Sequence, residues 1–248
     1  MGELIYCEFL KLKRSKMKLI AFLGTMVTPL ISVSQSIGMY VLKSDYKISF
    51  FTLFESAFMF LMLLFGVLIF SVIASYIFSR EYTEKTLKTL FTIPISKKNY
   101  IQCKFLALFI LVLVLMIISW AYVLILGIAL NMIFGISEFY VGMVLLFLWR
   151  FVLGGILLYF SIAPIALITL HTKGIIAPML TASVIVLVNV IFSTLPLSSF
   201  LPWAASYYIA SGNSWQMACP SFVSLIIIFL VFMISYKGCI LVFEKEDI

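Results

Sequence analysis

The chain has 248 residues, of which 64% are hydrophobic and only 11% are charged. Soluble domains are roughly half apolar and about one quarter charged, so this composition excludes a soluble globular protein and predicts a membrane protein. The net charge of +7 does not indicate a partner nucleic acid, because the basic residues flank apolar runs and form no patch of their own.

Six apolar runs are long enough to cross a membrane core of about 30 Å, which requires about 20 helical residues. They cover residues 19–40, 56–79, 105–134, 140–170, 174–194 and 222–243. The sequence therefore predicts an all-α polytopic membrane protein with six transmembrane helices in one domain, residues 1–248. The fourth run is too long for an upright span, so we expect it to be tilted, extended beyond the bilayer, or broken at Gly154-Gly155 or Pro164.

Lysine and arginine are distributed unequally between the two sides of the predicted bundle. Fourteen of the 17 lie on the side that also holds both termini: Lys11, Lys13, Arg14, Lys16, Lys18, Arg80, Lys85, Lys88, Lys97, Lys98, Lys104, Lys173, Lys237 and Lys245. Lys43 and Lys47 lie on the other side, and Arg150 falls within the fourth run. Because short cytoplasmic loops are enriched in basic residues, both termini are predicted to be cytoplasmic.

The N-terminal segment, residues 1–17, has the pattern of an amphipathic helix. On a helical wheel one side holds Ile5, Tyr6, Phe9, Leu10 and Leu12, the other holds Glu3, Cys7, Glu8, Lys11 and Arg14, and Lys13 interrupts the apolar arc. This pattern predicts a helix that lies in the cytoplasmic interface and contacts anionic lipid through its basic side chains. The alternative is that these lysines only set the topology.

The connection between the second and third runs, residues 80–96, shows a second amphipathic pattern. Thr83, Leu87, Leu90 and Phe91 share one side, whereas Glu81, Lys85 and Lys88 share the other. Pro94 is expected to end this helix, and Ser96 is expected to cap the next one. The pattern predicts a short cytoplasmic helix that is well placed to receive a partner protein.

The segment before the last run, residues 195–220, is uncharged and rich in proline and aromatic residues. These are Pro196, Pro202, Trp203, Tyr207, Tyr208, Trp215 and Pro220. The composition favours short helices that enter the outer leaflet, and an ordinary aromatic belt is the alternative.

Motifs for catalysis and for metal or nucleotide binding are missing from the sequence. It contains no GxxxxGK[ST] and no HExxH, its single histidine is His171, and its four cysteines (Cys7, Cys103, Cys219 and Cys239) are scattered. We therefore expect no enzyme activity, no metal site and no cofactor bound by this chain.

Ionisable residues inside the apolar runs are candidate functional residues, because a charge in lipid is costly. Arg150 is the clearest, and Glu55 lies at the outer start of the second run. Arg150 is expected to pair with Glu55, to extend to the outer interface, or to line a polar cavity that meets an anionic group of a substrate. Asn189 is expected to join two helices. Neither a proton relay nor an internal repeat is present, which argues against an ion-coupled transporter.

The order of these elements resembles the ABC-2 permease family over essentially the whole chain. Residues 81–96, EYTEKTLKTLFTIPIS, are similar to the first cytoplasmic loop of that family, and residues 8–15, EFLKLKRS, resemble the start of permeases from bacitracin-resistance and lantibiotic-immunity transporters. The resemblance implies an exporter subunit in a bacterial cell membrane.

The same resemblance implies partners and a substrate. Two copies of a separate ABC ATPase would bind ATP and magnesium, and a second permease subunit, expected to form a homodimer, would complete the pathway. The ATPase contact would be a coupling helix that includes Glu81, Thr83, Glu84, Lys85, Leu87, Leu90 and Phe91, with Phe9, Lys11, Lys13 and Arg14 of the N-terminal helix beside it. The candidate substrate path contains Arg150, Glu55, Trp203 and Tyr207.

The expected substrate is an amphipathic peptide antibiotic resembling bacitracin. Alternatives are a lantibiotic-immunity permease, a lipid or polysaccharide permease, and a membrane scaffold or sensor that transports nothing.

Overall fold

The computed structural model describes residues 2–42, 47–87, 96–135, 139–193, 195–213 and 217–246. Its elements are α1 (Gly2–Arg14), α2 (Met17–Leu42), α3 (Phe50–Phe60), a π-helix η1 (Leu61–Phe65), α4 (Gly66–Thr83), α6 (Lys97–Phe134), α7 (Val141–Thr172), α8 (Ile176–Ser193), a 3₁₀ helix η2 (Pro196–Phe200), α9 (Pro202–Ser211) and α10 (Ser221–Glu244). Six helical segments are long and apolar enough to span a membrane, namely α2, the continuous α3–η1–α4, α6, α7, α8 and α10. The predicted six-span, all-α fold is confirmed.

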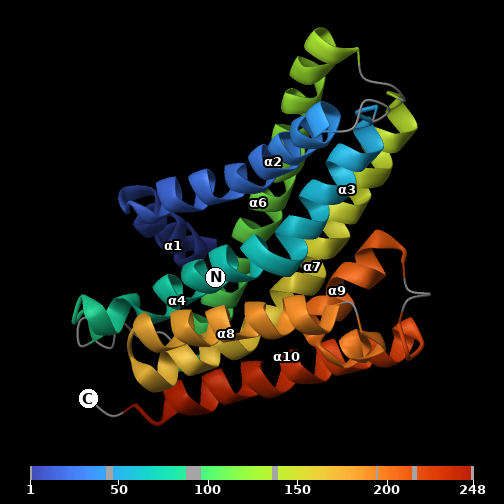
Figure 1. The fold of residues 1–248 in the computed structure, drawn as a ribbon. Coiled ribbons are helices and arrows are strands. Elements are labelled where there is room, and N and C mark those ends of the chain that lie inside the picture. Colours follow the sequence, from blue (N-terminus) through green and yellow to red (C-terminus); the bar gives the residue numbers. More distant parts are fainter. Residues whose placement is uncertain are drawn as a thin grey trace.

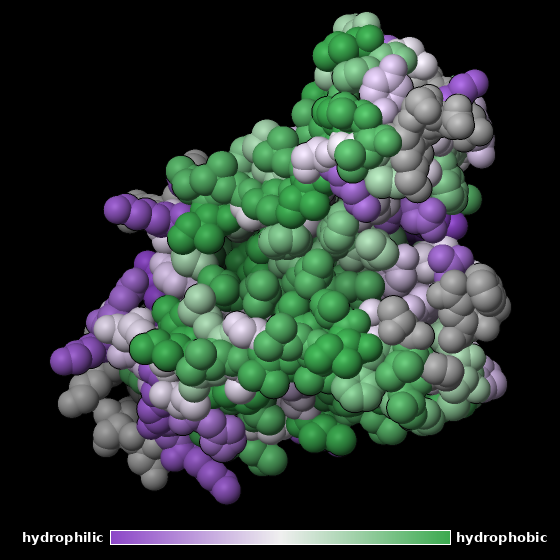
Figure 2. All heavy atoms as spheres, viewed as in Figure 1, coloured by the Kyte–Doolittle hydropathy of each residue, from purple (hydrophilic) through white to green (hydrophobic). Residues whose placement is uncertain are grey.

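The spans connect two ends of the molecule (Figure 1). One end, called the basic end below, contains α1, the end of α4, the start of α6, the turn between α7 and α8, and the end of α10, and it lies on the left of the view. Figure 2 shows a broad apolar band between hydrophilic side chains on the left and on the right. This distribution is what a bilayer requires, because only the two ends meet water.

Helix α7 lies at the centre of the bundle and packs against α4, α6, α9 and α10. In contrast, α8 and α10 present large apolar side chains outwards, and only 17% of the most apolar part of α10 is buried. Lipid is the natural partner of such a surface, since a soluble protein rarely exposes so large an apolar area.

The second span begins earlier than the hydropathy pattern predicted. The helix starts at Phe50, where the Ser49 side chain accepts a hydrogen bond from the Phe51 amide, and not at residue 56. The π-helix η1 then interrupts it, and Figure 1 shows α3 and α4 meeting there at an angle. Asn189 of α8 donates a 3.0 Å hydrogen bond to the carbonyl of Leu63 in this π-helix, so its predicted role in joining two helices is confirmed.

The fourth span is one unbroken helix, so a break at Gly154-Gly155 or Pro164 is excluded. The two glycines serve close packing instead. A Cβ at Gly154 would lie 2.9 Å from Met62 Sδ, and a Cβ at Gly155 would lie 2.9 Å from Met116 Cγ. With 32 residues α7 is about 48 Å long, and α6 with 38 residues is about 57 Å long, so both exceed the thickness of the membrane core.

Two short helices, η2 and α9, precede the last span, as the sequence predicted. Most of α9 is buried within the bundle, and the hydroxyl groups of Ser206 and Ser161 lie 3.1 Å apart where α9 crosses α7. Helix α9 is therefore held by the neighbouring helices, while its depth in the outer leaflet stays a prediction.

Candidate functional site

A buried cluster of charged side chains lies at the basic end, where α1, α4 and α6 meet. Lys104 of α6 donates hydrogen bonds to the Glu81 carboxylate and to the Ile77 carbonyl of α4. The Tyr100 hydroxyl donates to Glu81 at 2.7 Å, and Lys11 of α1 lies 3.4 Å from the same carboxylate.

The charges within this set balance, because Lys11 also pairs with Glu8 at 2.6 Å. We call these five residues (Glu8, Lys11, Glu81, Tyr100 and Lys104) the Glu81 cluster. Burial alone would lower the pKa of Lys11, but its hydrogen bond to Glu8 and the charges of Glu8 and Glu81 outweigh burial and hold that pKa above its usual value. Lys11 therefore carries its charge at neutral pH.

The Glu81 cluster joins four helices into one unit at the basic end. Its members come from α1, α4 and α6, and the ring of Tyr100 stacks on Phe243 of α10 at 5.6 Å between centroids. Glu81 is 4% exposed and Lys104 is 1% exposed. Charges buried this deeply are stable only when paired, so the four helices are expected to keep their relative positions at this end.

The predicted amphipathic faces differ from the structure at this cluster. Glu81 was placed on the outward, polar side of a separate coupling helix, but α4 continues to Thr83 and turns Glu81 inwards. Glu8 was placed on the polar face of the N-terminal helix, yet it is buried, whereas Tyr6 of the expected apolar face is 65% exposed. Glu81 is turned inwards because its partner Lys104 comes from α6, whereas Glu8 is buried beside Lys11 of its own helix, which also pairs with Glu81 of α4.

The chain leaves the bundle at a tight turn directly after α4. Thr83, Glu84 and Lys85 are exposed, and Lys85 has a φ of 53° in the left-handed region that ends the helix. Glu84 pairs with Arg80 one helical turn earlier at 2.9 Å. Leu87 is half-buried against the core, and Leu90 and Phe91 lie outside the described residues.

The remaining candidate contacts belong to α1, which packs against α6 and α2. Phe9 is half-buried, and the side chains of Lys13 and Arg14 lie outside the described part of the structure. The position of α1 in a membrane interface stays a prediction.

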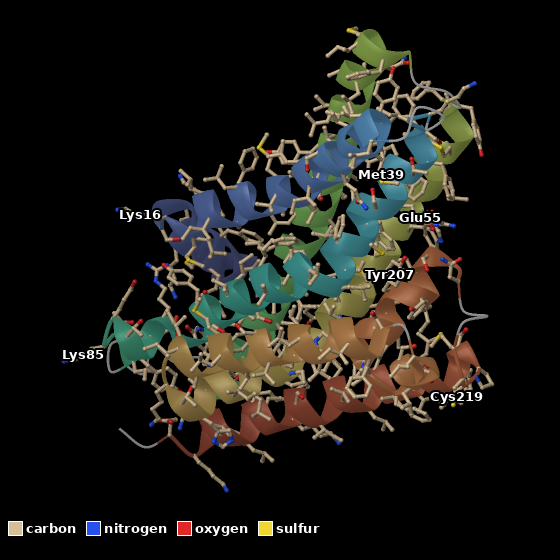
Figure 3. All side chains as sticks on the ribbon, viewed as in Figure 1. Lys16, Met39, Glu55, Lys85, Tyr207 and Cys219 are labelled. Carbon is tan, nitrogen blue, oxygen red and sulfur yellow. The ribbon has the colours of Figure 1, made fainter. Side chains whose placement is uncertain are left out.

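A polar cavity of about 440 Å³ opens at the opposite end of the molecule, between α3, η1, α8 and α9. Its lining is Thr52, Glu55, Ser56, Met59, Leu63, Ser193, Tyr207, Tyr208 and Asn213. Figure 3 shows Glu55 of α3 and Tyr207 of α9 on facing sides. Burial, followed by the charge of Glu55, raises the pKa of Tyr207 to about 12, so its hydroxyl stays protonated. We call this space the outer cavity.

Arg150 lies near the outer cavity without lining it. Its guanidinium is 5.0 Å from the centre of the Phe147 ring, and one guanidinium nitrogen would lie 3.9 Å from a Cβ built at Gly212, just after α9. Both Arg150 and Glu55 are described, and no ion pair joins them. Of the three alternatives for Arg150, pairing with Glu55 is therefore not observed, and its guanidinium packs on an aromatic face.

Trp203 is separate from this group. It lines a smaller space of about 90 Å³ with Asn189 and Leu201, between α8 and the start of α9. Of the candidate substrate path, the structure thus brings Glu55, Tyr207 and Arg150 together and leaves Trp203 apart.

Comparison with known proteins gives the family. A family model described as "ABC-2 family transporter protein" matches residues 4–189, which covers α1 through most of α8. The chain belongs to the ABC-2 transporter family.

This ABC-2 transporter is also similar to a permease that is named for bacitracin transport. It is 32% identical over 204 residues to the bacitracin transport permease protein BCRB of Bacillus licheniformis, and the match covers 82% of this chain and 96% of the relative. A permease relative of nearly full length and six apolar helices together make this ABC-2 transporter a multi-pass membrane protein.

Sequence reasoning missed that Glu81 and Lys104 of this ABC-2 transporter form a pair. Glu81 was assigned to the polar face of a cytoplasmic helix, and Lys104 was counted among the basic residues of the loop. One signal was available: Lys104 lies between Cys103 and Phe105, one turn after Tyr100 and directly before the apolar run of residues 105–134. A lysine next to a long apolar run favours an acidic partner on a neighbouring helix.

Proposed function

We propose that this chain is the membrane-spanning subunit of an ATP-driven exporter that removes an amphipathic peptide antibiotic such as bacitracin from the bacterial cell membrane and so confers resistance. The observation that carries the proposal is the 32% identity to a bacitracin transport permease along almost the whole of that relative. Both termini and the basic end would face the cytoplasm, in keeping with the excess of lysine and arginine there.

ATP would be hydrolysed by a separate ATPase chain, present in two copies, because this sequence has no loop for nucleotide phosphates. A second copy of the permease would complete the pathway. ATP and magnesium would then be bound only through the ATPase.

The turn after α4 is the best candidate for the ATPase contact. Thr83, Glu84 and Lys85 are exposed there and free to meet a partner surface. Directly behind this turn lies the Glu81 cluster, which connects α4 to α1 and α6. Force applied at the turn would therefore move several helices together instead of unwinding the end of α4. Movement of these helices would change the access of substrate to the pathway between the two permease subunits.

The first test is purification of the tagged chain from its native membrane together with the proteins that accompany it. We expect an ABC ATPase in near-equal amount, and we expect bacitracin to stimulate ATP hydrolysis by the complex in proteoliposomes. An ATPase that accompanies the chain but does not respond to any peptide antibiotic would favour a scaffold or a permease for another substrate.

The second test changes the proposed contact itself. Glu84→Arg reverses the charge of an exposed side chain, whereas Leu87→Asp would also disturb the core, so Glu84→Arg is the sharper variant. We expect it to weaken ATPase association and resistance. Glu244→Arg, the same change at an exposed glutamate of the basic end outside the turn, is the matched control. Equal association and resistance in both variants would refute the contact.

A further inference from the structure

The outer cavity has an unusual charge balance for a space at the edge of an apolar bundle. Among the described side chains that line it, Glu55 is the only charged one, and the other polar groups are hydroxyls and one amide. Within the described residues Glu55 has no ion-pair partner. In the part of the chain that the structure describes, the cavity therefore presents one carboxylate without an ion pair.

Arg150, which lies near the outer cavity, forms no ion pair with this carboxylate. Arg150 is held on the Phe147 ring and stands outside the lining, near Gly212. The lysine and glutamate side chains of the Glu81 cluster, in contrast, are fully matched at the other end. A charge close to lipid is costly unless water or an ion of opposite sign is next to it, so the carboxylate of Glu55 favours the binding of a cationic ligand.

The side chains on either side of Glu55 are suited to bind the uncharged part of such a cationic ligand. Met59 and Leu63 supply an apolar surface, and Tyr207 and Tyr208 supply aromatic rings that are 7% exposed each. Ammonium groups bind next to carboxylates and over aromatic faces, while their alkyl chains pack on apolar side chains. The volume of about 440 Å³ lies within the range of small-ligand sites, about 300–1,000 Å³, and accommodates a side chain or a chain end rather than a whole peptide.

We propose that the outer cavity binds a primary ammonium group of the exported peptide, with Glu55 as its counter-ion and the tyrosine and methionine side chains around its alkyl chain. This inference rests on the proposed function, and it specifies the class of substrate: an amphipathic peptide with a free amino group, bound by that group at the outer end of the permease.

The peptide arm of the test measures ATP hydrolysis by the complete complex in proteoliposomes, stimulated by bacitracin with free amino groups or by the same peptide after acetylation. With the unmodified permease, we expect acetylation to raise the peptide concentration that gives half-maximal stimulation of ATP hydrolysis about ten-fold. This is the effect expected for the loss of one charge-assisted hydrogen bond. Glu55→Gln should raise that concentration about ten-fold for the free-amino peptide and leave it unchanged for the acetylated one. Glu55→Asp should retain the preference for the free amine.

The matched control is Glu244→Gln, the same substitution at an exposed glutamate of the basic end, which should behave like the unmodified permease. Equal stimulation by the two peptides in the unmodified permease would overturn the proposal, and so would a Glu55→Gln variant that still prefers the free amine. Unstimulated ATP hydrolysis and the elution profile of each variant show whether it is folded.

A second arm does not depend on the identity of the substrate. The melting temperature of the complex is measured with hexylammonium and with hexanol, which share an alkyl chain and differ in charge. We expect greater stabilisation by hexylammonium, and we expect the difference to disappear in Glu55→Gln. If this difference is present but no peptide stimulates ATP hydrolysis, the proposed substrate is wrong while the amine site stands. If the difference is absent, the amine site is wrong whatever the peptides do.

Discussion

Replacing Lys104 by methionine would test the energetic importance of the Glu81 cluster. Lys104 is 1% exposed, and its ammonium donates to the Glu81 carboxylate and the Ile77 carbonyl. Methionine fills a similar volume, so the main effect of Lys104→Met is to leave the buried carboxylate without its nearest counter-ion, with only Lys11 at 3.4 Å and Tyr100 remaining. Removing one partner of a buried ion pair typically costs about 3–5 kcal/mol.

The expected cost corresponds to a large shift in a melting experiment. For a domain of about this size, 1 kcal/mol changes the melting temperature by about 2–4 °C, so Lys104→Met should lower it by roughly 6–20 °C. The assay heats the purified permease in detergent and follows the loss of the monodisperse peak. Lys98→Met, at an exposed lysine on the same helix, is the control and should change the melting temperature by less than about 2 °C.

The double variant Lys104→Met with Glu81→Gln separates the pair from its surroundings. Neither buried charge is left unpaired in this variant, so it should recover most of the stability that each single variant loses. The reasoning is refuted if Lys104→Met melts within 2 °C of the unmodified protein, or if the losses of the two single variants simply add in the double one.

Three further predictions concern packing and surface charge. Asn189→Leu removes the hydrogen bond to the Leu63 carbonyl and should cost about 1 kcal/mol, a fall in melting temperature of about 2–4 °C, and an unchanged value would assign that carbonyl another partner. Gly154→Leu should destabilise the permease by about 1–3 kcal/mol, because a Cβ at this position lies within 3.0 Å of side chains of the core. Gly38→Ala is the control: a Cβ there meets nothing within 4 Å, so this variant should be neutral or slightly stabilising in the same assay. Equal effects of the two variants would contradict the packing at Gly154. Glu246→Gln breaks an exposed ion pair and should cost below about 1 kcal/mol, with any loss disappearing at high salt.

Hydropathy alone predicts the spans because the membrane imposes one solution on the backbone. Each span must satisfy its own hydrogen bonds, so every long apolar run becomes a helix, and all six predicted spans are present. The start of the second span was placed too late, since Thr52, Glu55 and Ser56 interrupt the apolar run in a helix that already begins at Phe50. These polar residues in the first two turns line a cavity, and a hydropathy pattern cannot distinguish that environment from a loop.

The candidate sites were less predictable because they depend on contacts between helices. Glu81 and Lys104 are separated by 23 positions, and only the crossing of α4 and α6 makes them neighbours. A helical wheel assumes that charges point outwards, and this assumption fails where two helices bring opposite charges together. Similarly, pairing with Glu55 was one of three alternatives for Arg150, beside extension to the outer interface and lining a polar cavity. Glu55 lies on α3 and Arg150 on α7, so their distance depends on how these two helices pack, which no local pattern encodes.

The π-helix η1 gives the second span the properties of a lever with a hinge. Its irregular hydrogen bonding is the natural bending point of the span, while α4 beyond it is a stiff rod of 18 residues, about 27 Å long. A rotation of about 10° at η1 would displace the far end of that rod, at Glu84, by about 5 Å. The same relation between the angle at η1 and the position of the end of α4 holds in the opposite direction. A movement of several ångströms imposed on the turn at the basic end would become a small change of angle at η1, next to Met59 and Leu63, which line the outer cavity.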